Sequence, residues 1–218
     1  MENEQGSPGW YQDRSGCATA SRFIDIIAVS KRDGGPLKAR TDYMWTVATE
    51  RLYQTPIESI TAKSLEWGKE LEPFAIQAYE VETGNVIIPS GFVFHPTIEY
   101  CGASPDGLIG ECGGIEIKCP KDRRVHMQTW RYGMPEDHIP QVQGNIWVND
   151  LEWIDFISYD PRAPERFRLY VQRIHRDEKY ILALASHVID FLADVKSLLE
   201  QVDANQGRNL CGEPAIDG

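Results

Sequence analysis

The sequence contains no long apolar run, and no segment approaches the ~20 consecutive apolar residues that a membrane-spanning helix needs. Its opening, Met1 to Gln5, is polar and acidic and lacks the features of a secretory signal peptide. Internal repeats and low-complexity tracts are also missing, whereas the hydrophobic share (42%) and the charged share (25%) are those of a globular protein. We therefore expect a soluble protein that works in the cytoplasm and has no membrane partner.

The sequence also lacks the cysteine patterns of a disulfide scaffold. Its five cysteines are an odd number, and no two of them form a Cys-x-x-Cys pair. They fit a reducing compartment better than an oxidising one. Cys112 and Cys119 flank a predicted strand, but no histidine stands beside them at the spacing of a zinc site, so we expect no structural metal there.

Positive charge is scarce overall but concentrated in places. The formal net charge is −11, which on average repels nucleic acid. Cations nevertheless gather in residues 31–40, 118–131 and 162–176. Such clusters usually form solvated surfaces, yet phosphate affinity depends on local patches rather than on net charge. The composition therefore leaves nucleic-acid binding open.

The length of 218 residues suits one domain, and we predict a single domain over residues 1–218 with a flexible tail from about 203. Apolar periodicity predicts a helix with Thr19 as its N-cap and further helices at 42–52, 62–79, 139–148 and 177–201. Short strands are expected between 86 and 118 and at 155–159 and 167–174. This order predicts an α/β (α+β) fold, a central mixed β-sheet flanked by helices.

One segment is expected to bring acidic side chains and a lysine together. The turn sequence Ser104-Pro105-Asp106-Gly107 is followed, nine residues further on, by Glu116-Ile117-Lys118. Side chains alternate along a strand, so Glu116 and Lys118 share one face. A hairpin through residues 107–114 would place Asp106 beside Glu116, which gives two carboxylates and one ammonium at one polar spot of a sheet.

This combination is typical of hydrolytic metal sites. Two adjacent carboxylates repel each other unless a cation lies between them, and hard oxygen ligands select Mg²⁺ or Mn²⁺. A bound metal polarises a phosphoryl oxygen and acidifies water, and a lysine can orient or deprotonate that water. The alternative is an ordinary hairpin with a cross-strand salt bridge. Asp106 in a Pro-Asp-Gly turn at this spacing favours a metal-dependent nuclease core over that alternative.

The same residues carry a family resemblance. The pattern Pro-Asp…Glu-Ile-Lys resembles the PD-(D/E)XK nucleases, and residues 101–108 (CGASPDGL) with 114–120 (GIEIKCP) resemble more closely the bacteriophage λ exonuclease (YqaJ-type viral recombinase) family. Further segments similar to the family, in the family's order, are residues 14–21 (RSGCATAS), 67–72 (WGKELE), 140–143 (PQVQ) and 176–180 (RDEKY). The resemblance spans residues 10–180 and implies a PD-(D/E)XK restriction-endonuclease-like core.

The resemblance implies a catalytic centre at the matching positions. Asp106, Glu116 and the main-chain carbonyl of Ile117 would bind Mg²⁺, in a two-metal site that also accepts Mn²⁺. Lys118 would handle the attacking water. Some family members carry a further acid shortly before the Ser-Pro-Asp segment, but Glu99 is not in register with it, so that acid has no counterpart here.

Two helical residues would complete this centre. The resemblance gives Glu72 the role of an additional carboxylate and Gln141 that of holding the water or the substrate. Taken without the resemblance, Glu72 is an acid on a helix surface and Gln141 is an amide that satisfies a buried neighbour. Both alternatives stay open at this point.

A site for the terminal 5′-phosphate of DNA is implied as well. Arg14 and Ser21 would bind that phosphate, and Thr19 would lie beside them at the start of a helix, where anions bind favourably. An arginine adds a bidentate partner for the phosphate. Lys31 and Arg32 belong to the basic loop 31–40, which is either a DNA clamp or a mobile surface loop.

The activity implied by the resemblance is that of a Mg²⁺-dependent exonuclease. Such an enzyme degrades one strand of linear double-stranded DNA from its 5′ end, releases mononucleotides and leaves a 3′ overhang for recombination. A ring-shaped homotrimer around the DNA and a single-strand annealing protein as partner are also implied. An endonuclease with the same core and a catalytically silent scaffold that binds DNA ends remain as alternatives. The intact set Asp106, Glu116 and Lys118 weighs against the silent scaffold, and the lack of a cysteine cluster argues against the iron–sulfur branch of these nucleases.

Overall fold

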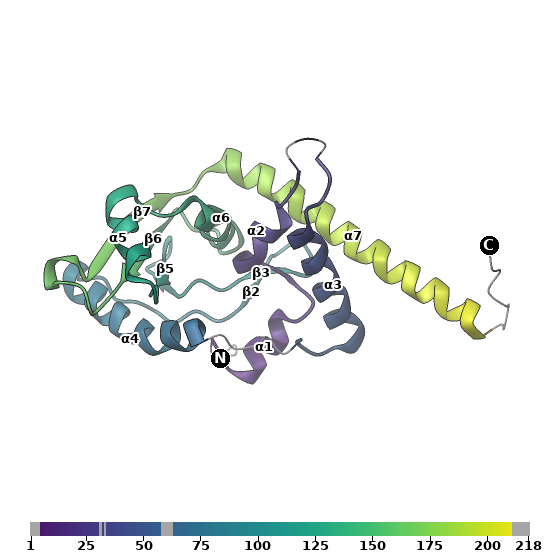
Figure 1. Ribbon diagram of the computed structural model, residues 1–218, viewed down its shortest axis with the longest axis horizontal. Coiled ribbons are helices and arrows are strands. Elements are labelled where there is room, and N and C mark those ends of the chain that lie inside the picture. Colours follow the sequence, from purple (N-terminus) through teal and green to yellow (C-terminus); the bar gives the residue numbers. More distant parts are fainter. Residues whose placement is uncertain (1–4, 31, 33, 58–62, 211–218) are drawn as a thin grey trace.

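The computed structural model describes residues 5–30, 32, 34–57 and 63–210 and has a mixed α/β architecture (Figure 1). Its helices are α1 (Pro8–Arg14), α2 (Phe23–Ile26), α3 (Lys38–Tyr53), α4 (Lys63–Thr83), α5 (Arg123–Tyr132), α6 (Ile139–Val148) and α7 (Glu178–Leu210). Its 3₁₀ turns are η1 (Ala20–Arg22), η2 (Glu136–His138) and η3 (Glu165–Phe167). Its strands are β1 (Ala18–Thr19), β2 (Val93–Phe94), β3 (Cys101–Ala103), β4 (Gly107–Ile109), β5 (Gly113–Lys118), β6 (Trp153–Tyr159) and β7 (Leu169–His175).

The larger sheet has the strand order β4-β5-β6-β7. β4 and β5 form an antiparallel hairpin, β5 and β6 run parallel, and β6 and β7 run antiparallel. Residues 113–117 of β5 are all buried, because helices cover both faces of the sheet. α4 packs on one face through Ala75 and Tyr79, and α6 packs on the other through Val142 and Ile146. The strand that carries Glu116 therefore lies at the centre of a three-layer arrangement.

The smaller sheet has the order β1-β3-β2, with β1 parallel and β2 antiparallel to β3. Its central strand is fully buried and leads directly into the Ser-Pro-Asp segment. Gly102 is required in this strand, because a Cβ at that position would lie 2.3 Å from the ring of Phe92. The smaller sheet thus fixes where Asp106 enters the hairpin of the larger one.

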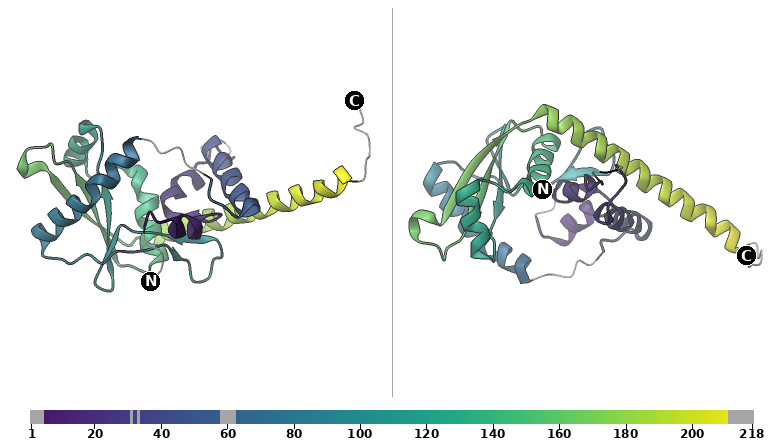
Figure 2. Two further views of the ribbon diagram at one scale, coloured as in Figure 1. Left: turned by 90° about the horizontal axis from the view of Figure 1, so that it is seen from below. Right: turned by 45° about the horizontal axis from the view of Figure 1, so that its top comes forward.

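α7 joins the two parts of the molecule. Its first half packs against α2, α3 and α6, and there Val188, Phe191 and Val195 are buried. The ring of Tyr43 stacks on Phe191 with centroids 5.2 Å apart. The second half of α7 extends beyond the rest of the chain (Figure 1 and Figure 2). In the described ranges, none of the helices combines the length and apolarity needed to cross a bilayer.

The predicted α/β class is confirmed, but the helix expected to start with Thr19 is wrong. The segment Ala18–Thr19 forms β1, paired with Cys101 and Gly102 of β3, and the Thr19 side chain makes no capping hydrogen bond. The parallel pairing with β3 holds this backbone extended. Helix α2 therefore begins only at Phe23 and has four residues.

Other element boundaries differ from the predictions as well. α7, expected to end near residue 201, continues to Leu210, although this segment includes the poor helix formers Asn205, Gly207 and Asn209. Residues 86–88, expected to form a strand, contribute only one bridge, between Ile88 and Leu108. α5 was not anticipated, because its residues show few apolar positions at helical spacing.

Candidate active site

The hairpin places Asp106 beside β5. The backbone N–H of Asp106 donates to the carbonyl of Ile115 (3.1 Å), and its Oδ2 accepts the backbone N–H of Ile117 (2.6 Å). Gly107 follows directly, and a Cβ there would lie 2.3 Å from Cγ2 of Ile87, so this close packing needs a glycine. The proximity of Asp106 and Glu116 expected from the sequence is therefore present.

Glu116 is almost completely buried, with 1% of its surface exposed, and it accepts hydrogen bonds at both carboxylate oxygens. Oε1 accepts from Nζ of Lys118 (2.6 Å) and from Nε2 of Gln141 (2.7 Å). Oε2 accepts from Nδ2 of Asn145 (2.9 Å). Lys118 Nζ also donates to Oε1 of Gln141 (3.1 Å), so lysine, glutamate and amide form a closed triangle of hydrogen bonds.

The acids of this site repel one another. Burial raises the pKa of Glu116 to about 7, and the nearby Asp106 adds to that shift. Burial and Asp106 likewise raise the pKa of Glu72, on α4, to about 7. Burial also raises the pKa of Asp106. Three carboxylates thus surround one ammonium, and a site with this excess of negative charge favours an additional cation.

Lys118 stays protonated in this environment. Burial lowers its pKa, but the carboxylates of Glu116 and Asp106 outweigh burial and bring the pKa above its ordinary value. The ammonium has three N–H donors, and two of them serve Glu116 and Gln141. Lys118 can therefore present a further donor to a water molecule or an anion.

The donor set fits Mg²⁺. No three His, Cys, Asp or Glu side chains in the described part of the chain lie close enough together to hold a metal by themselves. Asp106 and Glu116 supply two carboxylates, and Ile117, the residue after Glu116, offers a main-chain carbonyl. Mg²⁺ prefers hard oxygen ligands, keeps several waters and is commonly bound by one or two carboxylates plus substrate phosphates. Glu72 contributes to this site through its charge.

Arg14, Thr19 and Ser21 also come together. The guanidinium of Arg14 donates to Oγ of Ser21 (3.0 Å), and Oγ1 of Thr19 lies 3.3 Å from the same oxygen. The three side chains line a pocket of about 490 Å³ between α1, α3 and α4, together with the cations Arg22 and Lys69 and the acids Glu50 and Glu66. Burial lowers the pKa of Arg14, but its ordinary value is so high that the guanidinium remains charged.

The physical basis expected for this pocket needs correction. The sequence suggested the N-terminus of a helix as the source of anion affinity. Thr19 instead ends β1, and only a 3₁₀ turn and the four-residue helix α2 follow it. Side-chain donors, from Arg14 and two hydroxyls, therefore replace a helix dipole as the groups that would attract an anion.

Trp10 and Ser104 lie between the Arg14 pocket and the carboxylates, and together they form a wall that both regions share. The Trp10 indole N–H donates to Oγ of Ser104 (2.9 Å), and Ser104 stands two residues before Asp106. On its other side Trp10 lies under the guanidinium of Arg14, 4.1 Å from ring centroid to Cζ. Gln5 adds a second link by donating to Oδ1 of Asp106 (3.3 Å).

Sequence reasoning missed Trp10, Ser104 and Asn145 as parts of the site. From the sequence alone, Trp10 has no assigned role, and Ser104 is only part of a turn and of the segment that resembles the family. Asn145 stands four residues after Gln141, which places it on the same face of a helix. That spacing was the available signal.

Among the described residues of the basic loop, none lines the pocket around Arg14. Lys31 lies outside the described residues, and Arg32 is exposed in a turn where its backbone N–H donates to Oγ of Ser30 (3.2 Å). Ser30 and Gly35, on either side of Arg32, are joined by a hydrogen bond from the Ser30 N–H to the Gly35 carbonyl (2.8 Å). Arg32 is not among the residues that line the pocket around Arg14.

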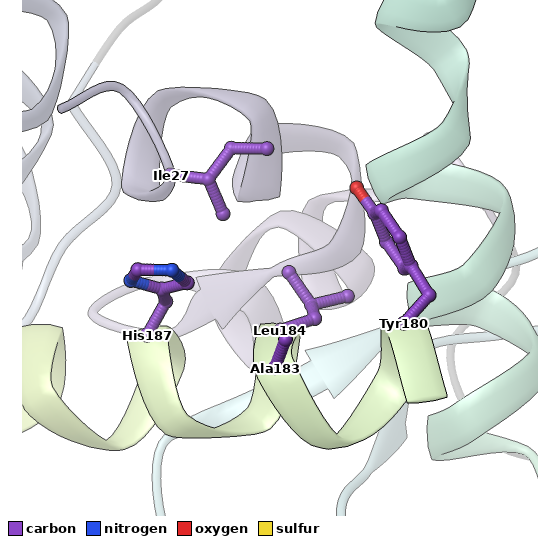
Figure 3. A pocket seen from close by; sticks show the side chains of 5 residues that line it. All are labelled: Ile27, Tyr180, Ala183, Leu184 and His187. Carbon is purple, nitrogen blue, oxygen red and sulfur yellow. The ribbon is translucent and has the colours of Figure 1, made fainter. Parts of the chain in front are cut away.

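A second, smaller pocket of about 260 Å³ lies elsewhere, between the end of α2 and the first turns of α7 (Figure 3). Ile27 contributes to one side, and Tyr180, Leu184 and His187 contribute from α7, together with Ala183. None of the site residues predicted from the sequence lines it. The catalytic candidates therefore belong to the sheet and to the Arg14 pocket.

Comparison with known proteins gives consistent results. Residues 9–152 match the model of the YqaJ-like viral recombinase domain. The chain is similar to LHK-Exo, an alkaline exonuclease from Laribacter hongkongensis: a crystal structure with dAMP has a TM-score of 0.85 and 35% identity, covering 93% of this chain and 99% of that one. A second crystal structure of LHK-Exo has a TM-score of 0.84 and 34% identity over the same shares.

A phage-related exonuclease from Haemophilus somnus 129PT shares the fold, with a TM-score of 0.64 and 17% identity over 87% of this chain and 96% of that one. No curated protein sequence matches this chain. The family match covers more than half of the chain, and the alkaline exonuclease structures align with nearly all of it. The chain therefore belongs to the YqaJ-like viral recombinase family and has an alkaline exonuclease fold, which supports a nuclease function.

Proposed function

We propose that this protein is a Mg²⁺-dependent exonuclease that degrades the 5′-ended strand of linear double-stranded DNA in the 5′-to-3′ direction. The observation that carries the proposal is the shared wall: Trp10 contacts Arg14 in the anion pocket and Ser104 in the segment that leads to Asp106. A terminal phosphate in that pocket would be separated from the carboxylates by Trp10 and Ser104. The carboxylates would then act on the next phosphodiester bond of the same strand.

The proposed roles follow from the contacts of each residue. Asp106, Glu116 and the carbonyl of Ile117 hold Mg²⁺, in a two-metal site that also accepts Mn²⁺. The bound metal supplies Lewis acidity toward the phosphoryl oxygen and lowers the pKa of water. Lys118, whose pKa is raised by the surrounding carboxylates, acts as a donor that orients the attacking water. Glu72 adds negative charge to the site, and Gln141 fixes Lys118 and Glu116 relative to each other.

Polarity and product follow from the Arg14 pocket. Arg14, Ser21 and Thr19 bind the terminal 5′-phosphate, so hydrolysis of the first phosphodiester releases a 5′-mononucleotide and creates a new 5′-phosphate. Repetition leaves a 3′ single-stranded overhang for homologous recombination by strand annealing. Lys31 and Arg32 contact the duplex ahead of the site, since a basic loop attracts the phosphate backbone without reading sequence.

The proposal includes the assembly and the cellular setting. A single nuclease domain of residues 1–218 forms a toroidal homotrimer around DNA and works with a single-strand annealing protein in the cytoplasm of a bacterial or phage-infected cell. Support comes from the family and from the charge distribution. A chain with a net charge of −11 repels bulk DNA, whereas local cations attract the strand that enters the site.

The test uses linear duplex DNA with a 5′-phosphate or a 5′-hydroxyl, incubated with Mg²⁺ beside a covalently closed circle. The expected result is loss of the 5′-ended strands as mononucleotides, faster from phosphorylated ends, with the circle intact. Cutting of the circle would assign the protein to the endonuclease alternative. Binding of ends without hydrolysis in Mg²⁺ or Mn²⁺ would assign it to the silent scaffold.

A further inference from the structure

α6 presents two amides to the same carboxylate. Gln141 and Asn145 are four residues apart, one helical turn, and their side chains reach the two different oxygens of Glu116. Nε2 of Gln141 donates to Oε1 (2.7 Å) and Nδ2 of Asn145 donates to Oε2 (2.9 Å). Gln141 belongs to the segment that resembles the family, whereas nothing in that resemblance gives Asn145 a role.

Burial of the Asn145 side chain is unfavourable unless it has a hydrogen-bond partner, and Glu116 provides one. It is 1% exposed, and its neighbours on α6, Gly144 and Ile146, are buried as well. Asparagine is a poor helix former, and a buried amide without a hydrogen-bond partner is unfavourable. The hydrogen bond from Nδ2 to Oε2 of Glu116 offsets this cost.

The hydrogen bonds leave Glu116 little freedom to bind a cation. An ionised carboxylate has about four lone-pair positions, two on each oxygen. Lys118 and Gln141 use the two positions on Oε1, and Asn145 uses one of the two on Oε2. One position remains, and it is on Oε2.

We propose that Asn145 is a positioning residue for the metal site: it fixes the rotation of the Glu116 carboxylate so that Oε2 offers one lone pair to the divalent cation. Glu116 is then a one-oxygen ligand whose direction is set by α6. Without the Asn145 donor, Oε2 has two open positions, and only the hydrogen bonds of Lys118 and Gln141 to Oε1 still restrain rotation of the carboxylate. This inference rests on the metal site of the proposed function.

The test compares two substitutions that remove the same donor with different packing. Asn145→Leu keeps most of the side-chain volume, and Asn145→Ala leaves a cavity. Gln143→Leu is the matched control, because Gln143 is another buried amide of α6 (3% exposed) that bonds to the backbone of His175 and Asp177, away from Glu116. Thermal unfolding followed by circular dichroism measures the stability of each variant.

The readout is the binding of Mn²⁺ alone to the DNA-free protein, with free Mn²⁺ quantified by electron paramagnetic resonance. Loss of a group that orients a metal ligand typically weakens metal affinity about 10–100-fold, and we expect such a loss in both Asn145 variants and none in Gln143→Leu. The Mg²⁺ concentration for half-maximal hydrolysis should rise in parallel, with an unchanged KM for DNA ends.

Two results would overturn the inference. One is wild-type Mn²⁺ affinity in Asn145→Leu; the other is affinity that follows unfolding temperature across all three variants, which would indicate general destabilisation. The proposed function is judged separately, by hydrolysis of linear DNA by the unaltered protein. If the protein binds Mn²⁺ in an Asn145-dependent way but does not hydrolyse linear DNA, the result would contradict the proposed function and leave the inference on Asn145 intact. A protein that binds no Mn²⁺ would contradict both.

Discussion

The carboxylate cluster on β5 and the pocket around Arg14 handle charge in opposite ways. In the cluster, Glu116 accepts hydrogen bonds from Lys118 and from two amides, so most of its acceptor positions are used within the protein and one position on Oε2 stays open. In the pocket, Arg14 donates to a hydroxyl of Ser21 and stacks on an aromatic ring. A hydroxyl and a ring leave the positive charge of Arg14 available to an anion. One region thus accumulates negative charge, to which the proposed function assigns a cation, and the other keeps an available positive charge, to which it assigns a phosphate.

The largest effect is expected from a substitution in the carboxylate cluster. Lys118→Ala should lower the rate of strand loss about 10²–10⁴-fold, the range for a positioned group in proton transfer and water activation, because the water loses its donor and Glu116 loses its cation. Binding of DNA ends should persist. Single-turnover hydrolysis of a labelled duplex measures the rate, and Lys121→Ala, an exposed lysine three residues on, is the control. A change of less than tenfold would contradict the role of Lys118.

The next largest effect is expected from a substitution in the pocket around Arg14. Arg14→Ala should reduce the preference for a 5′-phosphate over a 5′-hydroxyl about 10–150-fold, which corresponds to the ~1.5–3 kcal/mol of hydrogen bonds to a charged group. Arg14→Lys should recover only part of it, since an ammonium lacks the bidentate fork. The ratio of kcat/KM for the two ends is the measurement. Arg124→Ala serves as a control because Arg124 is exposed and paired with Asp122. An unchanged ratio would remove Arg14 from the phosphate site.

A pH series sharpens the comparison without any substitution. The pKa of Glu72 and Glu116 is raised to about 7 in the folded protein and is ordinary in the unfolded one, so folding favours their protonated forms. The metal-free protein should therefore lose stability as pH rises from about 4.5 through 7. Mg²⁺ competes with these protons, so its stabilisation should be larger at pH 8 than at pH 6. Unfolding temperatures with Mg²⁺ and with EDTA at both pH values test this; an equal Mg²⁺ effect at both would exclude these carboxylates as ligands.

The smallest effect concerns the wall between the regions. Trp10→Phe removes the donor to Ser104 and weakens the stacking under Arg14, and a hydrogen bond of this kind contributes about 0.5–1.5 kcal/mol. We expect a few-fold loss in both the 5′-phosphate preference and the rate, whereas Lys118→Ala and Arg14→Ala each affect mainly one of them. Parallel measurement of the two quantities decides; a change confined to one of them would mean that the wall does not couple the regions.

The two regions also differ in how far the sequence predicts them. Asp106, Glu116 and Lys118 lie within thirteen positions of one hairpin, and strand alternation with a Pro-Asp-Gly turn is enough to bring them together. Local rules suffice there because the contacts are local. Arg14 and Ser21 are also close in the sequence, and the resemblance to the family indicated their association.

The rest of the site depends on contacts that local rules do not contain. Trp10 meets Ser104 across 94 residues, and Asn145 meets Glu116 across 29, only because α1 and α6 pack against the sheets. Thr19 was misassigned for the same reason, since its pairing with β3 overrides a good capping propensity. The length of α7 beyond residue 201 was missed because composition alone suggested a frayed end.

The Trp10 wall would fix how far from the DNA end the proposed enzyme cuts. If the pocket holds the terminal phosphate and the carboxylates hold the metal, the distance between them is set by an indole ring and a serine rather than by any base. The fragment removed in each step then has a fixed length, whatever the nucleotide sequence. In a DNA end that carries additional phosphates, the distance from the terminal phosphate to the first internucleotide bond is longer, so that bond is displaced from the carboxylates.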